Sequence, residues 1–148
     1  MKKWKTAALI VLPAVVLLCA VGFACSPRGA AAAFRCHRGD FERAAAEALA
    51  AGSGEGVKRP AGVHQIAVEP DPTGSGNCVE FEMGGAGLGS STSYWGVTFS
   101  RGGPVGLDGV ALDYVEDGDG WLWKESGGDN WSRVTPLGEC WYLYEMHF

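Results

Sequence analysis

The C-terminal stretch, residues 112–148, constrains the fold most, because short apolar runs alternate in it with acidic, glycine-containing turns. It holds four of the six tryptophans, which are Trp121, Trp123, Trp131 and Trp141. The Asp-Gly pairs between the runs tolerate positive φ and therefore favour the tight turns of β-hairpins. We expect a β-meander here.

The last run, Cys140 to Phe148, is typical of an interior strand. Successive side chains of a strand point to opposite faces of the sheet. Trp141 and Leu143 therefore share one face, and the other face carries Tyr142, Tyr144, Met146 and Phe148. Both faces are apolar, which favours a strand that is covered on both sides.

The residues before the meander predict one helix and several further strands. Asp40 is a suitable N-cap for a helix over Phe41–Ala51, and Gly52 ends it. Strands are expected at Val63–Glu69, Val79–Met83 and Tyr94–Ser100. In Val79–Met83 the apolar residues alternate with glutamates, so we expect Glu80 and Glu82 in water. The fold class is α+β, with one helix on a mostly antiparallel sheet of about six short strands.

The N-terminus has the pattern of a membrane or export segment. Lys2, Lys3 and Lys5 precede an uncharged run, Ala7 to Ala24, which is just long enough for a transmembrane helix. We expect residues 1–33 to be a signal anchor and residues 34–148 to form an extracytoplasmic domain. The protein would then be a single-pass protein of the cell membrane with its C-terminal domain outside. The alternative is a signal peptide, cleaved near Ala33, and a secreted domain.

Charge is distributed unevenly along the chain. Residues 61–148 contain three basic and thirteen acidic residues, a formal charge of about −10, although the whole chain carries −5. Nucleic-acid binding depends on neutralising phosphates with basic residues. The sequence therefore excludes a nucleic-acid partner.

Three cysteines, Cys36, Cys78 and Cys140, follow the apolar segment. Cys78 and Cys140 each begin a predicted strand, so they are the candidate disulfide pair, and free buried thiols are the alternative that we favour. The chain has no C-x-x-C motif, and we expect no zinc site.

No motif indicates catalysis. The glycine run Gly84 to Gly89 lacks the G-x-G-x-x-G spacing and precedes a strand, so we expect a flexible hairpin connection. There is no G-x-S-x-G motif, and no spacing links His64 or His147 to a serine. We expect no catalytic residue and no cofactor.

A candidate binding surface comes from the composition of the meander. Its turns are acidic and flank tryptophans, which can stack on sugars or cations. The candidate ligand-binding residues are Glu116, Asp117, Asp119, Trp121, Trp123, Asp129 and Trp131, and the expected partners are a basic protein or an envelope glycan. The alternatives are a purely structural aromatic core and, for the carboxylates, a calcium site, although their spacing departs from that of an EF-hand.

Several segments resemble a family of short, uncharacterised Gram-positive bacterial proteins. The resemblance rests on Ser91–Gly96, Asp117–Trp123, Gly128–Asn130 and Trp141–Phe148, and it covers most of the chain after Val63. Members of the family have an N-terminal membrane segment and a C-terminal β-rich domain with aromatic and acidic residues. The family has no established activity, so the resemblance implies an architecture and no site.

These observations together predict a membrane-tethered extracytoplasmic domain that binds a ligand and catalyses nothing. A small cell-envelope hydrolase, using His64 or His147, and a purely structural envelope protein are the alternatives.

Overall fold

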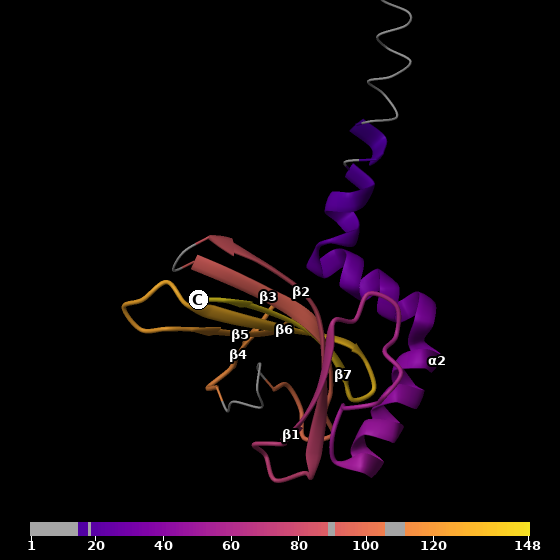
Figure 1. Cartoon of the computed structure of the whole chain (residues 1–148). Coiled ribbons are helices and arrows are strands. Elements are labelled where there is room, and N and C mark those ends of the chain that lie inside the picture. The colour runs from indigo at the N-terminus through magenta and orange to yellow at the C-terminus, as the bar shows by residue number, and fades with distance from the viewer. Residues whose placement is uncertain (1–14, 18, 89–90, 106–111) are drawn as a thin grey trace, which may run out of the picture.

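The computed structural model describes residues 15–17, 19–88, 91–105 and 112–148. In these residues a long helix, α2 (Pro27–Ala51), packs on one face of a seven-stranded antiparallel sheet (Figure 1). The strands are β1 (Gln65–Pro70), β2 (Asn77–Leu88), β3 (Ser91–Phe99), β4 (Val115–Asp117), β5 (Gly120–Lys124), β6 (Trp131–Gly138) and β7 (Trp141–His147). The predicted α+β class is confirmed.

Two meanders meet in the middle of the sheet. The strand order is β1-β2-β3-β7-β6-β5-β4, so β3 and β7 join the N-terminal meander to the C-terminal one. The predicted interior position of the last strand is therefore confirmed. Its residues also alternate as expected, because Trp141 lies in the core on the α2 side and Tyr144 lies in a second cluster of buried residues.

Helix α2 begins well before the predicted start at Asp40. Ser26 is its N-cap and accepts a hydrogen bond from the amide of Gly29 over 3.2 Å, and Pro27 occupies the first helical position. One residue inside the helix, His37, is non-helical (φ −122°, ψ 24°), and the helix continues past it. The additional turns form because their apolar side is buried on the sheet, which a propensity argument does not capture.

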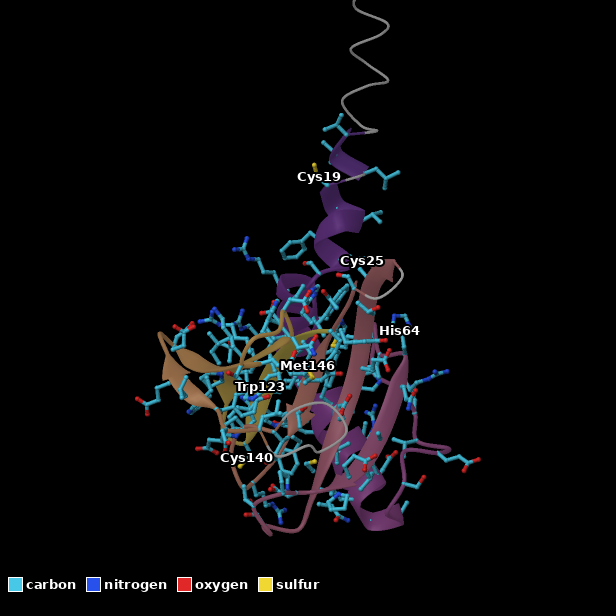
Figure 2. All side chains as sticks on the ribbon, turned by 90° about the vertical axis from the view of Figure 1, so that its left-hand side faces the viewer. Cys19, Cys25, His64, Trp123, Cys140 and Met146 are labelled. Carbon is cyan, nitrogen blue, oxygen red and sulfur yellow. The ribbon has the colours of Figure 1, made fainter. Side chains whose placement is uncertain are left out.

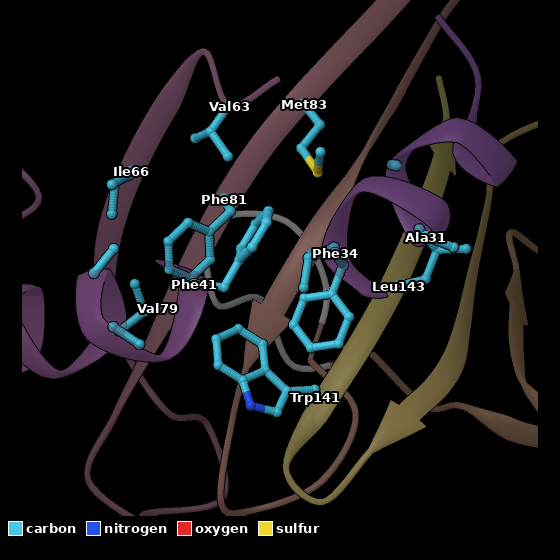
Figure 3. Packing of buried hydrophobic residues seen from close by; sticks show 14 of the residues in the cluster. Ala31, Phe34, Phe41, Val63, Ile66, Val79, Phe81, Met83, Trp141 and Leu143 are labelled. Carbon is cyan, nitrogen blue, oxygen red and sulfur yellow. The ribbon is translucent and has the colours of Figure 1, made fainter. Parts of the chain in front are cut away.

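The main core lies between α2 and the sheet, where four aromatic rings meet (Figure 3). Phe34 and Phe41 extend from α2, Phe81 from β2 and Trp141 from β7. The ring centroids of Phe34 and Trp141 are 4.9 Å apart, and those of Phe41 and Phe81 are 5.2 Å apart. Phe81, Trp95 and Leu143 are all buried, as the alternation of the strands predicts.

The opposite face of the sheet is also covered, and this makes the prediction for Glu80 wrong. Glu80 is only 5 % exposed and accepts a hydrogen bond from the hydroxyl of Tyr144 over 2.9 Å. A second apolar cluster lies on this face, with Val134, Tyr144 and Met146 at its centre. The alternation identified the two faces correctly, but it did not show that both faces are buried.

The glycine run at Gly84 is part of a strand, so the predicted flexible connection is wrong over Gly84–Leu88. Gly84 pairs with Trp95, and a Cβ at Gly84 would lie 2.6 Å from Cζ2 of that indole ring. Glycine is required here because the Trp95 ring lies against the backbone of β2. Gly89 itself lies outside the described residues.

The N-terminal segment, Val15–Ala24, is helical and points away from the domain (Figure 1). Its large apolar side chains are exposed, and Val16, Leu17 and Phe23 are each more than half accessible to solvent. Among the described residues no single helix passes for a membrane span, but Val15–Ala24 together with α2, bent by 75°, has the required length and composition. A signal sequence has the same features. The basic residues of the predicted start lie outside the described residues.

Candidate functional site

The predicted binding residues all lie at one end of the sheet, on β4, β5, β6 and their turns. Glu116 and Asp117 are in β4, Trp121 and Trp123 are in β5, and Trp131 begins β6. Asp119 and Asp129 are exposed in the two turns. The hairpins bring these residues into one region, but strand alternation divides them between the two faces of the sheet.

Trp121 and Trp123 lie on the face opposite α2. Trp121 pairs with Val134, packs against the second cluster and meets Tyr142 edge to face, with ring centroids 6.0 Å apart. Trp123, which is labelled in Figure 2, is partly buried, and its partner in strand pairing is Ser132. Glu116, opposite Trp121, shares this face. This half of the predicted site therefore serves mainly to cover the sheet.

Trp131 and Asp117 lie on the other face, in a groove of about 920 Å³. Helix α2 lies mainly over β1, β2, β3 and β7. It leaves most of β6 and β5 open on the same face, although Leu137 near the end of β6 packs against the main core. The groove lies between this open part of the sheet and the first turn of α2. Its lining consists of Phe23, Ser26, Pro27, Arg28, Asp117, Leu122, Lys124, Trp131, Arg133, Leu143 and Glu145.

Five charged residues line the groove. Arg133 pairs across the strands with Glu145, and it forms an ion pair with Asp117 with 3.0 Å between nitrogen and oxygen. Burial raises the pKa of Glu145, and the positive charges of Arg133 and Arg28 oppose that rise. The groove thus combines partly desolvated charges with the apolar surfaces of Leu122 and Trp131, a composition that is typical of ligand sites.

A small polar cluster adjoins the groove at Trp131. The indole ring stacks on the imidazole of His147 with 6.0 Å between centroids and 16° between planes. Nδ1 of His147 lies 2.9 Å from the hydroxyl of Ser93, and Nε2 lies 3.4 Å from that of Ser91. Within the described residues no carboxylate lies within ion-pair distance of His147. His64, the other histidine considered as a base, is exposed at a separate place in the fold (Figure 2).

Cys78 and Cys140 are free thiols in this structure. Cys78 precedes Val79, and Cys140 precedes Trp141; these two residues pair with Phe99 from opposite sides. Strand β3 therefore separates the two cysteines, and two strand spacings exceed the Cα separation that a disulfide spans. Burial, followed by the nearby Asp71 carboxylate, raises the pKa of the Cys78 thiol to about 11.

Sequence reasoning did not select the groove residues Phe23, Arg28, Arg133 and Glu145. A signal for two of them was present, because Arg133 and Glu145 lie two residues from Trp131 and Leu143 and therefore share their face. No sequence signal places Phe23 and Arg28 against β5 and β6, because that contact depends on how α2 lies across the sheet.

Among the described residues no three His, Cys, Asp or Glu side chains are grouped as metal ligands. Glu116, Asp117 and Asp119 lie along one hairpin, where Asp117 is engaged by Arg133. Comparison with protein-family models, with curated protein sequences and with solved structures found no match for this chain.

Proposed function

We propose that the protein is a membrane-tethered, extracytoplasmic binding domain whose ligand occupies the groove between α2 and strands β5 and β6. The observation that carries this proposal is the groove itself. It is formed where much of a regular sheet is left uncovered, and it presents Trp131 and Leu122 together with the cross-strand neighbours Arg133 and Glu145. A purely structural protein has no need for partly buried charges beside an open aromatic surface.

The tether is proposed from the N-terminal segment. Its apolar residues are exposed on all sides, which is stable in a bilayer and costly in water. The lysines near the start favour a cytoplasmic N-terminus and an external domain. External protease on intact protoplasts should therefore release the domain, and protection of the domain would contradict the proposed topology.

Ligand binding is tested by photo-crosslinking in intact membranes. A photoreactive phenylalanine derivative replaces Leu122 in the groove, and a control protein carries it at Ala50, which is exposed near the end of α2. A crosslinked species that forms from Leu122 and not from Ala50 supports a groove ligand, and its mass distinguishes a lipid, an envelope glycan and a basic protein. Equal crosslinking at both positions, or none at Leu122, would favour a purely structural protein.

A small envelope hydrolase is the second candidate, and one observation favours it. The structure brings Ser91 and Ser93 to His147, within hydrogen-bond distance for Ser93. A serine nucleophile requires such a base, but the base is usually oriented by a third group, and no described carboxylate pairs with His147. Hydrolysis of model esters that is lost in both His147→Asn and Ser93→Ala would establish this function, and hydrolysis that persists in both would remove it.

A further inference from the structure

The basic residues of the sheet are concentrated at the groove. After residue 60 the chain has only three of them, Arg101, Lys124 and Arg133, among thirteen acidic residues. Two of the three, Lys124 and Arg133, line the groove, and Arg28 joins them from the first turn of α2. The groove thus gathers three cations beside an acidic sheet, and a local excess of one charge attracts ligands of the opposite sign.

Two of these cations are available to a ligand. Arg133 is engaged by Asp117 through an ion pair and through a hydrogen bond of 3.1 Å to the backbone oxygen of that residue. Among the described residues, neither Arg28 nor Lys124 takes part in an ion pair. With Asp117 and Glu145 counted against the three cations, the groove carries a net charge of about +1, which complements one phosphodiester.

The groove also lies beside the exposed apolar helix. Phe23 belongs to the N-terminal segment and lines the groove, and only Ala24, Cys25 and Ser26 separate it from α2. In a bilayer the hydrocarbon core is about 30 Å thick, and the headgroups extend it to about 40–45 Å. If Val15–Ala24 ends at the edge of the hydrocarbon, Arg28 lies at the depth of the lipid phosphates.

The apolar lining is suited to the rest of an amphiphile. Leu122, Trp131 and Phe23 provide hydrocarbon and ring surface next to the cations. Tryptophan is enriched at membrane interfaces because its ring is apolar and its N–H is polar. A ligand with one negative phosphate and a short stretch of glycerol and acyl chain would meet both kinds of surface.

We infer that the groove binds the phosphodiester headgroup of an anionic membrane lipid, with the phosphate between Arg28 and Lys124 and the adjoining glycerol and acyl carbons against Leu122, Trp131 and Phe23. This inference rests on the proposed function, because it identifies the ligand class of the same groove and requires the groove to lie at the membrane surface.

The test uses the full chain in micelles of a neutral detergent, with dihexanoyl phosphatidylglycerol as the probe. The NMR signal of the Trp131 indole N–H, assigned with Trp131→Phe, reports binding. We expect a saturable shift with this probe and no saturable shift with dihexanoyl phosphatidylcholine, whose headgroup has no net charge. The double variant Arg28→Gln, Lys124→Gln should weaken binding at least about tenfold, because it removes both charge-assisted hydrogen bonds to the phosphate.

The matched control is Arg43→Gln, Arg101→Gln, which removes the same charge outside the groove. Arg43 pairs with Asp40 on α2, and Arg101 lies over the ring of Phe99. Equal weakening in this control, or equal binding of the phosphatidylcholine, would overturn the inference in favour of nonspecific attraction. Equal binding of glycerol 3-phosphate would overturn it in favour of a soluble phosphate ligand.

The outcome also separates this inference from the proposed function. Detergent micelles do not require insertion into a membrane, so the assay is independent of the protease test of topology. A domain that is protected from external protease but binds the anionic probe contradicts the tether topology alone. Crosslinking to a glycan or protein at Leu122 without a shift from the anionic probe contradicts the lipid inference alone.

Discussion

Tyr144 donates a hydrogen bond to the carboxylate of Glu80 over 2.9 Å on the sheet face opposite α2, and neither side chain is more than 5 % exposed. The two residues are far apart in the chain, and strand β3 lies between their strands. Buried carboxylates are stable only when they are hydrogen-bonded. This contact therefore helps to hold the two meanders in register.

Tyr144→Phe should reduce the free energy of unfolding by about 1–3 kcal/mol, because it leaves a buried carboxylate oxygen without this donor. Urea unfolding followed by tryptophan fluorescence measures the change. Tyr142→Phe is the control, because Tyr142 is only partly buried and should cost less than about 0.5 kcal/mol. Equal costs for the two changes would show that the hydroxyl of Tyr144 does not stabilise Glu80.

Gly84→Ala should destabilise the domain by about 1–3 kcal/mol, because the new Cβ would lie 2.6 Å from the Trp95 ring. Gly39→Ala is the matched control, since a Cβ there meets nothing within 4 Å. In a helix that exchange is expected to stabilise by up to about 1 kcal/mol. Thermal unfolding of both variants gives the comparison, and a neutral Gly84→Ala would mean that Trp95 moves freely.

Phe81→Ala should cost about 3–5 kcal/mol, since the ring is fully buried against Phe41 and Trp141. A domain of ordinary stability would be close to unfolding at room temperature. Phe148→Ala removes a ring that is 40 % exposed and should cost much less. An unchanged melting temperature for Phe81→Ala would contradict the arrangement of the main core.

A chain that begins at Phe34 should be less stable than one that begins at Ser26, by about 2–3 kcal/mol. The shorter chain lacks the N-cap and two buried alanines, Ala30 and Ala31. Calorimetry of the two truncated proteins measures the difference. If the chain is cleaved in the cell, a cut before Ser26 preserves the domain, whereas a cut near Ala33 removes part of the core. Equal stability of the two proteins would show that residues 26–33 do not stabilise the domain, so that cleavage near Ala33 is compatible with the fold.

Lowering the pH should reduce the free energy of unfolding of the domain, because Asp71 becomes protonated. Burial acts to raise the pKa of this carboxyl, but hydrogen bonds from Thr73, Ser100 and Gly102 outweigh it, so the pKa is lower than usual. A carboxyl with a lowered pKa stabilises the fold above its unfolded value, about 3.9, and this contribution is lost as the pH falls towards the folded value.

In Ser100→Ala the free energy of unfolding should therefore fall less as the pH is lowered below 5, because the change removes one of the donors to Asp71. Urea midpoints across that pH range measure the effect, with Ser126→Ala in an exposed turn as the control. An unchanged acid dependence in Ser100→Ala would show that the Ser100 hydrogen bond does not stabilise ionised Asp71.

The sequence alone was sufficient to predict the fold class, the interior position of the last strand and the two faces of several strands. Alternation of apolar residues is a local property, so it placed Phe81 and Leu143 in the core, and it put Trp141 and Tyr144 on opposite faces. The turn between β4 and β5 was recognised from its Asp-Gly pairs for the same reason. The exposed N-terminal segment retains the composition of a membrane span or a signal sequence.

Only the tertiary structure decided what covers each face. Glu80 alternates like a solvated residue but is buried, because a second apolar cluster closes that face of the sheet. Gly84 occupies a strand position that requires glycine, because the ring of Trp95 lies where a side chain would be. Trp121 and Trp131 are close in sequence but lie on opposite faces, so the predicted site is divided. The groove depends on where α2 stops covering the sheet, and this long-range packing has no local pattern in the sequence.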